Sequence, residues 1–459
     1  MVTVEGKDPE SGYGWLAAVL PAHARRFRVA DPALAEVLGD AGAELIDVEP
    51  DVEIAGVGQL RGDAPVSIAV LGRPGSGERS FAVRAARRLV SSVRVRLAAR
   101  YARRAVHRLG YSTVLVFTWD QQQRLRNQAT RRRTRSRVPL REYFPRRALI
   151  VGQRTPRGGS LLDAVLADAN DLARVSLQAD APSIRTGVLI ADAEQGILRV
   201  ALGSGSRQIR NQRAALTALR ASGAPELVAD RVPWVLASGR CGLADWSLER
   251  RLRGSPATPS VTGRLLVDCV DFLVALHSAR SAETPRSTLL EQVEIIVPAA
   301  RREEARVLQA LAEQLEATLA DVPRGFVHGD FFHGNLLTED GRLVGVIDWD
   351  AAGPGRLPLI DLLHLRHATH AVAERDWGPR LVDELLPWAV AGGDDIAQGY
   401  CERLGFSLDR RQLEAVVLAY WLDRLSSQLR SHAHRLAEPV WLARNISLVL
   451  SAVTERTRS

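Results

Sequence analysis

Short apolar runs alternate with polar residues in GFVHGDFFHGNLLTEDGRLVGVIDWDAAGPGRLPLIDLLHL, residues 325–365, and no other feature constrains the fold of this chain as much. The pattern predicts two apolar strands, one through 326–327 and 335–337 and the other through 343–349. The turn at 339–342 contains Asp-Gly and joins them into a hairpin. Such a hairpin brings the residues that end its strands into one small site.

Three polar side chains, Asp330, Asn335 and Asp348, stand at the ends of these predicted strands. Carboxylate and amide oxygens suit Mg²⁺, which keeps waters and phosphate oxygens in its remaining positions. Phosphoryl transfer needs such a set: one carboxylate orients the acceptor hydroxyl, and further oxygen ligands hold the metal. The alternative is a solvated turn, which does not explain why all three lie beside apolar strands at this spacing.

The same segment resembles the aminoglycoside phosphotransferase/choline kinase-like family, which has a protein-kinase-like fold. The matching residues are those of the catalytic loop, the metal motif and the stretch after it: His328, Gly329, Asp330, Asn335, Ile347, Asp348, Trp349, Pro358, Asp361 and Leu362. Upstream, LVALHS at 273–278 is similar to the helix that ends in Leu-His before the family's catalytic loop. The combined match is specific, whereas His-Gly-Asp alone would not be. The resemblance covers about residues 174–459.

The resemblance implies an ATP- and Mg²⁺-dependent phosphotransferase that acts on a hydroxyl of a small molecule. Asp330 would be the catalytic base, and Asn335 and Asp348 would ligate magnesium. His328, grouped with Asp330 as a catalytic residue, would support the loop from behind, and Asp361 would brace it through backbone hydrogen bonds. The alternatives are an ordinary core histidine for His328 and a helix cap for Asp361.

The region expected to bind ATP departs from the kinase pattern, in which a strand lysine binds phosphate and pairs with a helix glutamate. Lys7 is the only lysine and lies outside the resembling region. Arg199 stands at the lysine position and Gln212 at the glutamate position, with Arg185 the next candidate for a phosphate anchor. Arginine keeps a fixed charge and can grip phosphate with two hydrogen bonds. Gln212 could equally be a plain surface residue.

The order of predicted elements divides the chain into three parts. Residues 1–165 alternate strands and helices, as expected of an α/β domain of unknown function. Residues 166–260 hold mainly strands, and residues 261–459 are mainly helical apart from the hairpin segment. Strands followed by helices predict an α+β, two-lobed protein-kinase-like domain. Its small lobe is β-rich, and its larger helical lobe carries the catalytic loop.

Strands are predicted in the first part at 66–72, 112–119 and 147–153. An arginine-rich helix pattern follows the first of them, and 124–147 reads as a polar, basic loop. The turn at 71–80 lies between a strand and a helix, where phosphate-binding loops occur. It has a glutamate in place of the usual lysine, which favours a purely structural turn.

Positive charge is concentrated in the same part of the chain. The whole chain has a net charge of +8, and residues 1–165 hold 28 basic and 16 acidic residues. Residues 80–147 could bind nucleic acid or another polyanion. They lack interleaved aromatic residues that would stack on bases, so a solvated basic face is the favoured interpretation.

Bulk features favour a cytoplasmic location. The three cysteines are scattered, which fits a reducing compartment better than a disulfide framework. No stretch approaches the roughly 20 apolar residues of a membrane span. The first residues, MVTVEGKDPESGYGW, lack the basic and apolar pattern of a secretory signal.

Three functions stay open from the sequence. The first is a small-molecule kinase. The second is a catalytically inactive kinase-like module that binds a nucleotide or another ligand, suggested by Arg199 and Gln212. The third is a two-part protein whose basic N-terminal domain binds a polyanion. The acceptor is not readable: residues 353–459 hold 13 basic and 13 acidic residues, and so provide no acidic field for a polycationic aminoglycoside.

Overall fold

The structure is a computed structural model of the whole chain. It describes residues 16–46, 50–55, 66–71, 113–119, 125–127, 147–153, 160–173, 183–185, 188–278, 289–369, 377–431, 435–436 and 438–458. The predicted arginine-rich helix and most of the predicted basic loop at 124–147 lie outside these residues.

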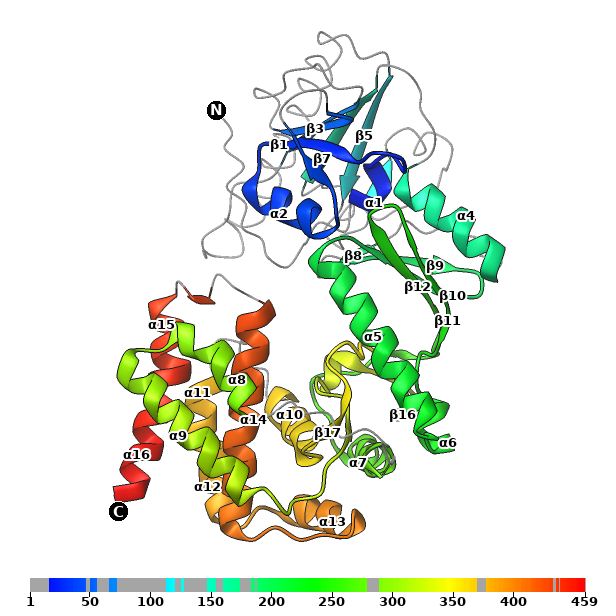
Figure 1. Cartoon of the computed structure of the whole chain (residues 1–459). Helices are drawn as coiled ribbons and strands as arrows, with labels where there is room; N and C mark the ends of the chain where they lie inside the picture. Colours follow the sequence, from blue (N-terminus) through cyan, green and yellow to red (C-terminus); the bar gives the residue numbers. More distant parts are fainter. Residues whose placement is uncertain are drawn as a thin grey trace, which may run out of the picture. The chain divides into compact units, whose positions relative to one another are not determined.

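The chain forms two compact units (Figure 1). One consists of Met1–Arg210 and Trp234–Arg251, and the other of Asn211–Pro233 and Leu252–Ser459. The division falls within helix α5 (Ser204–Ala221). The three domains drawn from the sequence stay a prediction.

The first unit begins with a mixed α/β layer. Its seven-stranded sheet has the order β2-β1-β3-β4-β7-β5-β6, parallel from β2 to β4 and antiparallel from there on. The strands are β1 (Arg26–Val29), β2 (Glu44–Leu45), β3 (Val52–Ala55), β4 (Val66–Leu71), β5 (Thr113–Trp119), β6 (Leu125–Asn127) and β7 (Arg147–Gln153). The helices are α1 (Leu16–Val19), α2 (Pro32–Asp40) and α4 (Leu161–Ala173).

The three predicted strands are confirmed as β4, β5 and β7. Strand β6 corrects the prediction of a loop at its position, since it pairs with β5.

The β-rich lobe belongs to the same unit. It is a five-stranded antiparallel sheet of order β11-β12-β10-β9-β8. The strands are β8 (Ser183–Arg185), β9 (Val188–Ala193), β10 (Gly196–Ala201), β11 (Val235–Cys241) and β12 (Ala244–Arg250). Successive side chains of a strand point to opposite faces, so apolar and polar residues that alternate along a strand lie on different faces of the sheet.

One face of this sheet shares a hydrophobic core with the N-terminal elements. Leu198, Val200, Trp246 and Leu248 are fully buried in one cluster with residues of α1, α2, α4, β1 and β3. The indole of Trp246 donates a 2.8 Å hydrogen bond to Asp168 on α4. The β-rich lobe therefore completes its core with the N-terminal elements, and these elements cover its apolar face.

The second unit contains short strands around the predicted hairpin. They are β13 (Ser255–Pro256), β14 (Gly325–Val327), β15 (Leu336–Glu339), β16 (Arg342–Val346) and β17 (Gly353–Arg356). The hairpin of β15 and β16 is confirmed, and β13 extends it. The predicted continuous strand through 326–327 and 335–337 is wrong, because β14 pairs with β17 and a 3-10 turn, His333–Asn335, precedes β15. The chain turns at Gly329, whose φ of +79° lies in the left-handed region that favours glycine.

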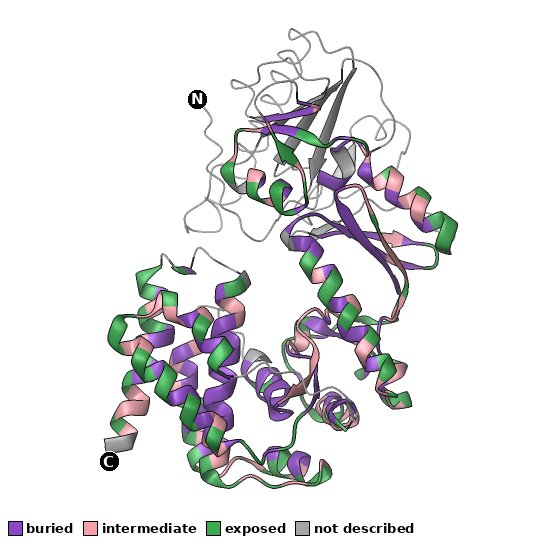
Figure 2. Cartoon of the chain, in the orientation of Figure 1, coloured by how far each residue is buried: buried purple, intermediate pink, exposed green. Residues whose placement is uncertain are grey.

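The rest of the second unit is the helical lobe. Its helices are α6 (Glu226–Ala229), α7 (Gly263–His277), α8 (Leu289–Ile296), α9 (Arg302–Thr318), α10 (Leu359–Thr369), α11 (Trp377–Arg380), α12 (Leu386–Val390), α13 (Asp395–Arg403), α14 (Arg410–Ser431), α15 (Pro439–Leu442) and α16 (Leu448–Arg458). Helix α14 contacts α8, α9, α10 and α12, and Figure 2 shows α10 and α14 as mostly buried. Among the helices described, none has the length and apolar character needed to span a membrane.

Candidate active site

Asp330 lies in the loop between β14 and the 3-10 turn, with its side chain 36% exposed. Its Oδ1 accepts hydrogen bonds from His364 Nε2 at 3.1 Å and from Arg424 Nη1 at 3.0 Å. Its Oδ2 accepts one from Asn335 Nδ2 at 2.9 Å. Burial alone would raise the pKa of Asp330, but His364, Arg424 and His328 together hold it well below its usual range. The carboxylate is thus fixed in place and ionised.

A buried carboxylate braces this loop from behind. Asp361, in the first turn of α10, accepts hydrogen bonds from the backbone N–H groups of His328 at 2.7 Å and Gly329 at 2.8 Å. His277, at the end of α7, lies 3.0 Å from the same carboxylate and also contacts Tyr400. Burial would raise the pKa of Asp361, but these partners lower it to about 2. Asp361 therefore binds the catalytic loop and does more than cap its own helix.

His328 is fully buried and holds the loop to the metal motif. Its Nδ1 accepts the backbone N–H of Asp330 at 3.2 Å, and its Nε2 lies 3.0 Å from the carbonyl of Ile347. A neutral ring with its proton on Nε2 satisfies both partners. Burial lowers the pKa of His328, which favours this neutral form. These contacts give His328 a supporting position rather than one facing a substrate.

Asn335 and the metal motif are joined through the backbone. The amide nitrogen of Asn335 donates to both the carbonyl and the carboxylate of Asp330, so its Oδ1 is the atom left to ligate a metal. The backbone N–H of Ile347 donates to the carbonyl of Asn335 at 2.9 Å. Asp348 follows directly, so the two proposed metal-ligating residues belong to hydrogen-bonded segments.

Asp348 has an unusual backbone conformation. Its φ is +68°, a left-handed value that costs most side chains roughly 1–2 kcal/mol but that Asp and Asn tolerate. The buried Trp349 that follows donates its backbone N–H to Gln212 Oε1 at 3.2 Å. Gln212 is 1% exposed, so the alternative of a plain surface residue is wrong. Backbone strain of this kind is concentrated at functional sites.

A network of buried charges on α14 was missed by the sequence analysis. Arg424 contacts the carbonyl of Gly329 and donates to Asp423 at 2.8 Å, in addition to its bond with Asp330. Asp423 also pairs with Arg356, which donates to the carbonyl of Ala351 at 2.8 Å. The network thus links the catalytic loop to the chain that follows Asp348. The sequence does contain one signal for this network, an Asp-Arg pair inside the apolar run VVLAYWLDRL, 416–425. Charged residues in such a run are expected to be buried, and buried charges need partners.

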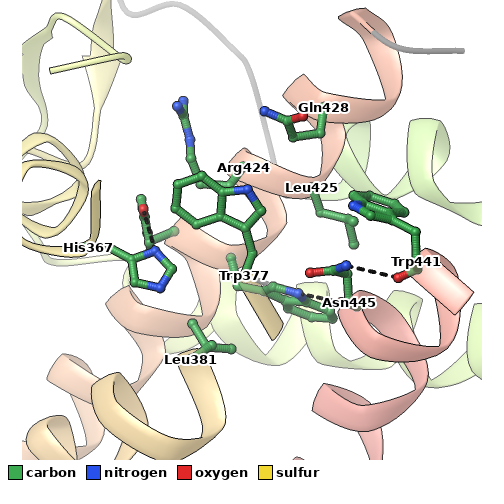
Figure 3. A pocket seen from close by; sticks show the side chains of 10 residues that line it. His367, Trp377, Leu381, Arg424, Leu425, Gln428, Trp441 and Asn445 are labelled. Carbon is green, nitrogen blue, oxygen red and sulfur yellow. Dashed lines mark hydrogen bonds between the residues drawn. The ribbon is translucent and has the colours of Figure 1, made fainter. Parts of the chain in front are cut away.

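Aromatic residues pack behind Arg424 (Figure 3). Trp377, Trp441 and Asn445 line a small pocket with Arg424, and Asn445 donates to the carbonyl of Trp441 at 2.9 Å. The pocket has room for only about 10 Å³, which is the space of a single water. The aromatic side chains that line it pack against α14, and the pocket is too small to be an acceptor site.

The residues predicted to bind ATP phosphates lie on the β-rich lobe. Arg199 on β10 forms an ion pair of 3.8 Å with Glu249 on β12, and Ser247 donates to Glu249 at 2.9 Å. The Arg199 side chain is 11% exposed. Arg199 and Ser247 are directly paired across β10 and β12, on the face opposite the apolar core. Arg185 lies in β8.

The residues present suit Mg²⁺ by their chemistry. Asp348 supplies a carboxylate and Asn335 an amide oxygen, both hard oxygen donors. Within the described ranges, no group of three or more His, Cys, Asp or Glu side chains is arranged to hold a metal. A magnesium site does not require one, because this ion often keeps only one or two protein ligands beside waters and phosphate oxygens.

The part of the chain that carries this geometry matches a known family. Residues 185–400 match the model of the phosphotransferase enzyme family, APH. This segment belongs to that family. The matched segment begins at the last residue of β8 and includes β9 to β12, the predicted catalytic loop and metal motif, and α10, which confirms the resemblance seen in the sequence over residues 185–400. A search of curated proteins found no significant match.

Solved structures with similarity to the chain include three aminoglycoside phosphotransferases. APH(3'')-Id from Streptomyces rimosus ATCC10970 is 20% identical, with a TM-score of 0.39, over 58% of this chain and 97% of that one. The GDP complex of aminoglycoside 2'-phosphotransferase-IIIa is 13% identical, with a TM-score of 0.42, over 64% and 97%. A mutant APH(4)-Ia bound to ADP and hygromycin B is 17% identical, with a TM-score of 0.37, over 63% and 97%. Similarity at this level carries no information about the acceptor.

Proposed function

We propose that this protein is an ATP- and Mg²⁺-dependent kinase that transfers phosphate to a hydroxyl group of a small molecule. The observation that carries the proposal is the set of contacts on Asp330, which is held by Asn335, His364 and Arg424 in a loop braced by Asp361. The family match over residues 185–400 supports the same class of reaction.

Asp330 would orient the acceptor hydroxyl. A carboxylate with a lowered pKa takes up a proton poorly, so its main contribution is to align the hydroxyl oxygen with the phosphate. Loose phosphoryl transfer depends mostly on positioning and charge stabilisation, which suits such a group. Arg424 and His364 keep the carboxylate in one orientation.

Asn335 and Asp348 are the residues that would hold magnesium, whose charge neutralises phosphate oxygens when it is bound. Gln212 would orient this site through its bond to the backbone of Trp349. Arg199 would anchor the nucleotide phosphates, with Arg185 as the second candidate, and Glu249 would position the guanidinium.

Two other functions remain as alternatives. A catalytically inactive ligand-binding module has no need for a braced Asp330 beside Asn335 and Asp348, so this function is disfavoured. Binding of nucleic acid or another polyanion concerns residues 80–147, most of which lie outside the described part of the chain. That function and the cytoplasmic location stay predictions.

The proposal is tested by incubating the full chain with ATP, Mg²⁺ and a panel of hydroxylated metabolites, and by detecting phosphorylated products by mass. We expect at least one product that requires Mg²⁺ and disappears with Asp330→Asn. Tight Mg-ATP binding without a product from any class of acceptor would instead support the inactive module.

A further inference from the structure

The two ring nitrogens of His364 have different partners. Its Nε2 lies 3.1 Å from Oδ1 of Asp330, and its Nδ1 lies 3.0 Å from the hydroxyl of Tyr420 on α14. His364 and Tyr420 are both buried. The imidazole of His364 therefore connects the carboxylate proposed to orient the acceptor with a hydroxyl inside the helical lobe.

The spacing of residues on two helices produces this arrangement. His364 and His367 are three residues apart on α10, and Tyr420 and Arg424 are four residues apart on α14. Residues at either spacing lie on one face of a helix. Helices α10 and α14 are in contact, and Asp330 Oδ1 accepts one hydrogen bond from each, through His364 and through Arg424.

The partners of His364 decide which of its ring nitrogens carries the proton. The ionised carboxylate of Asp330 can only accept, so Nε2 must carry a proton to bond with it. Burial and the charge of Arg424 lower the pKa of His364, which favours the neutral ring. A neutral ring with its proton on Nε2 has a bare Nδ1, so the hydroxyl of Tyr420 donates to that nitrogen.

The opposite tautomer of His364 fits these contacts poorly. A bare Nε2 would face the Asp330 carboxylate at 3.1 Å, with no proton between two acceptors. Arg424 Nη1 lies 3.5 Å from Nε2, which is longer than the usual hydrogen bond, and it already donates to Asp330 at 3.0 Å. The approach of Arg424 to His364 is thus that of two donors sharing one acceptor oxygen.

A second histidine orients the Tyr420 hydroxyl. Nδ1 of His367, which is labelled in Figure 3, lies 3.3 Å from the hydroxyl oxygen and donates to it when it carries the proton. The Trp377 ring packs against both histidines, with its centroid 5.7 Å from that of His364 and 4.5 Å from that of His367. The hydrogen bonds then run in one direction, from His367 through Tyr420 and His364 to Asp330.

We propose that Tyr420 is a positioning residue for phosphoryl transfer, whose hydroxyl donates to Nδ1 of neutral His364 and thereby aims the Nε2–H of that ring at Asp330. The proposal rests on the function proposed above, in which Asp330 orients the acceptor hydroxyl. Without the Tyr420 hydroxyl, the buried Nδ1 loses its donor and the ring is held less firmly. The carboxylate is then less well oriented, which lowers the rate of transfer and not nucleotide affinity.

The contact is tested by nitrogen-15 NMR of the full chain labelled at histidine, in two-bond spectra that distinguish protonated from bare ring nitrogens. The chain has ten histidines, and the signal lost in His364→Gln identifies His364. We expect a proton on Nε2 and a hydrogen-bonded, bare Nδ1, whose signal moves in Tyr420→Phe to that of a nitrogen without a donor. A proton on Nδ1 or on both nitrogens, or an unchanged Nδ1 signal in Tyr420→Phe, would overturn the proposal.

The effect on catalysis is measured as phosphate release from Mg-ATP, in which water takes the place of the acceptor. Tyr420→Phe should lower kcat per folded molecule by about 3- to 10-fold, the size expected of one hydrogen bond, with KM for Mg-ATP unchanged. Trp421→Phe is the control on the same helix, because it removes a buried 2.9 Å hydrogen bond to the carbonyl of Asn445. It should lower stability but not kcat, and equal losses of kcat in the two variants would contradict a positioning role.

A double-mutant cycle tests whether Tyr420 acts through His364. In a His364→Ala background, Tyr420→Phe should change kcat by less than about twofold, because the ring that it positions is gone. His364→Gln should retain more activity than His364→Ala, since its amide can still donate to Asp330. The same fold-loss from Tyr420→Phe in both backgrounds would disprove the connection.

The two kinds of measurement separate this proposal from the proposed function. If wild type releases no more phosphate than Asp330→Asn, the kinase function fails, and the catalytic role of Tyr420 fails with it. The histidine spectra require no turnover, so they decide the contact between Tyr420 and His364 in either case. Normal kcat in Tyr420→Phe beside an active wild type would contradict the positioning role alone.

Discussion

Arg424 Nη1 lies 3.0 Å from Asp330 Oδ1 and is itself buried between Asp330 and Asp423. The positive charge of Arg424 is therefore in direct contact with the Asp330 carboxylate, which we propose orients the acceptor hydroxyl. Because Arg424 also contacts the carbonyl of Gly329, it sets the position of the whole loop and not only that of one side chain.

Arg424→Gln should impair turnover and stability together. Loss of the guanidinium removes a charged partner that Asp330 and Asp423 share, and breaking a buried ion pair typically costs about 3–5 kcal/mol of unfolding free energy. The pKa of Asp330 should rise, so the acid limb of the turnover profile should move to higher pH. Urea denaturation and a pH profile of kcat measure the two effects.

Arg430→Gln on the same helix is the matched control, because Arg430 is exposed. Arg424→Lys should restore part of the activity, since it keeps the charge but not the forked geometry. If the pH profile of kcat for Arg424→Gln keeps the acid limb of the wild type, Arg424 does not position Asp330.

Asp361 predicts a specific acid dependence of stability. Its folded pKa of about 2 lies below the ordinary value of 3.8, so its contribution is present above about pH 4 and is lost as the pH falls through about 2. At 1.36 kcal/mol per pKa unit, the contribution is about 2 kcal/mol. The difference in unfolding free energy between wild type and Asp361→Asn should be constant above pH 4 and shrink below it. A difference in unfolding free energy that does not change with pH would contradict the claim that Asp361 stabilises the fold as an ionised carboxylate.

Asp348→Asn should abolish most Mg²⁺-dependent nucleotide affinity without unfolding the protein. Asparagine tolerates the left-handed backbone at this position, so the substitution removes the charge and keeps the fold. Calorimetry with ATP, with and without Mg²⁺, measures the loss, and the melting temperature serves as the control. Unchanged Mg-ATP affinity would show that Asp348 is not a metal ligand.

The sequence predicted several contacts of the loop that carries His328, Asp330 and Asn335, because its residues are close together in the chain and specific in type. The hairpin, the bracing role of Asp361 and the burial of His328 are all found in the structure. The extent of the first strand was predicted wrongly, because alternation of apolar residues does not reveal that Gly329 turns the chain between two sheets.

The charges on α14 could not be assigned from sequence alone. Arg424 lies 94 residues from Asp330, and the chain has many arginines, so one of them has no distinguishing local pattern. Glu249 was missed for a similar reason: its pairing with Arg199 depends on the register of β10 and β12. Partners of this kind follow from packing rather than from motifs.

Arg199→Ala should weaken ATP binding about 10- to 100-fold if this residue anchors phosphate, since hydrogen bonds to charged groups contribute roughly 1.5–3 kcal/mol. Arg199→Lys should retain part of the affinity, because a point charge remains. Glu249→Gln tests whether any loss comes only from the broken ion pair. Normal ATP affinity in Arg199→Ala would move the anchor elsewhere, with Arg185 as the next candidate.

The central claim is that Asp330 serves the chemical step. Asp330→Asn keeps the shape of the side chain but removes the charge that orients the acceptor, and positioned groups of this kind contribute about 10²–10⁴-fold to rate. Stability should fall as well, because Arg424 loses one of its two charged partners, so turnover must be expressed per folded molecule. The decisive measurement is kcat of the folded fraction, with Mg-ATP affinity determined on the same preparation. We expect kcat to fall by about 10²–10⁴-fold while Mg-ATP affinity stays near that of the wild type, and full turnover per folded molecule would contradict the mechanism.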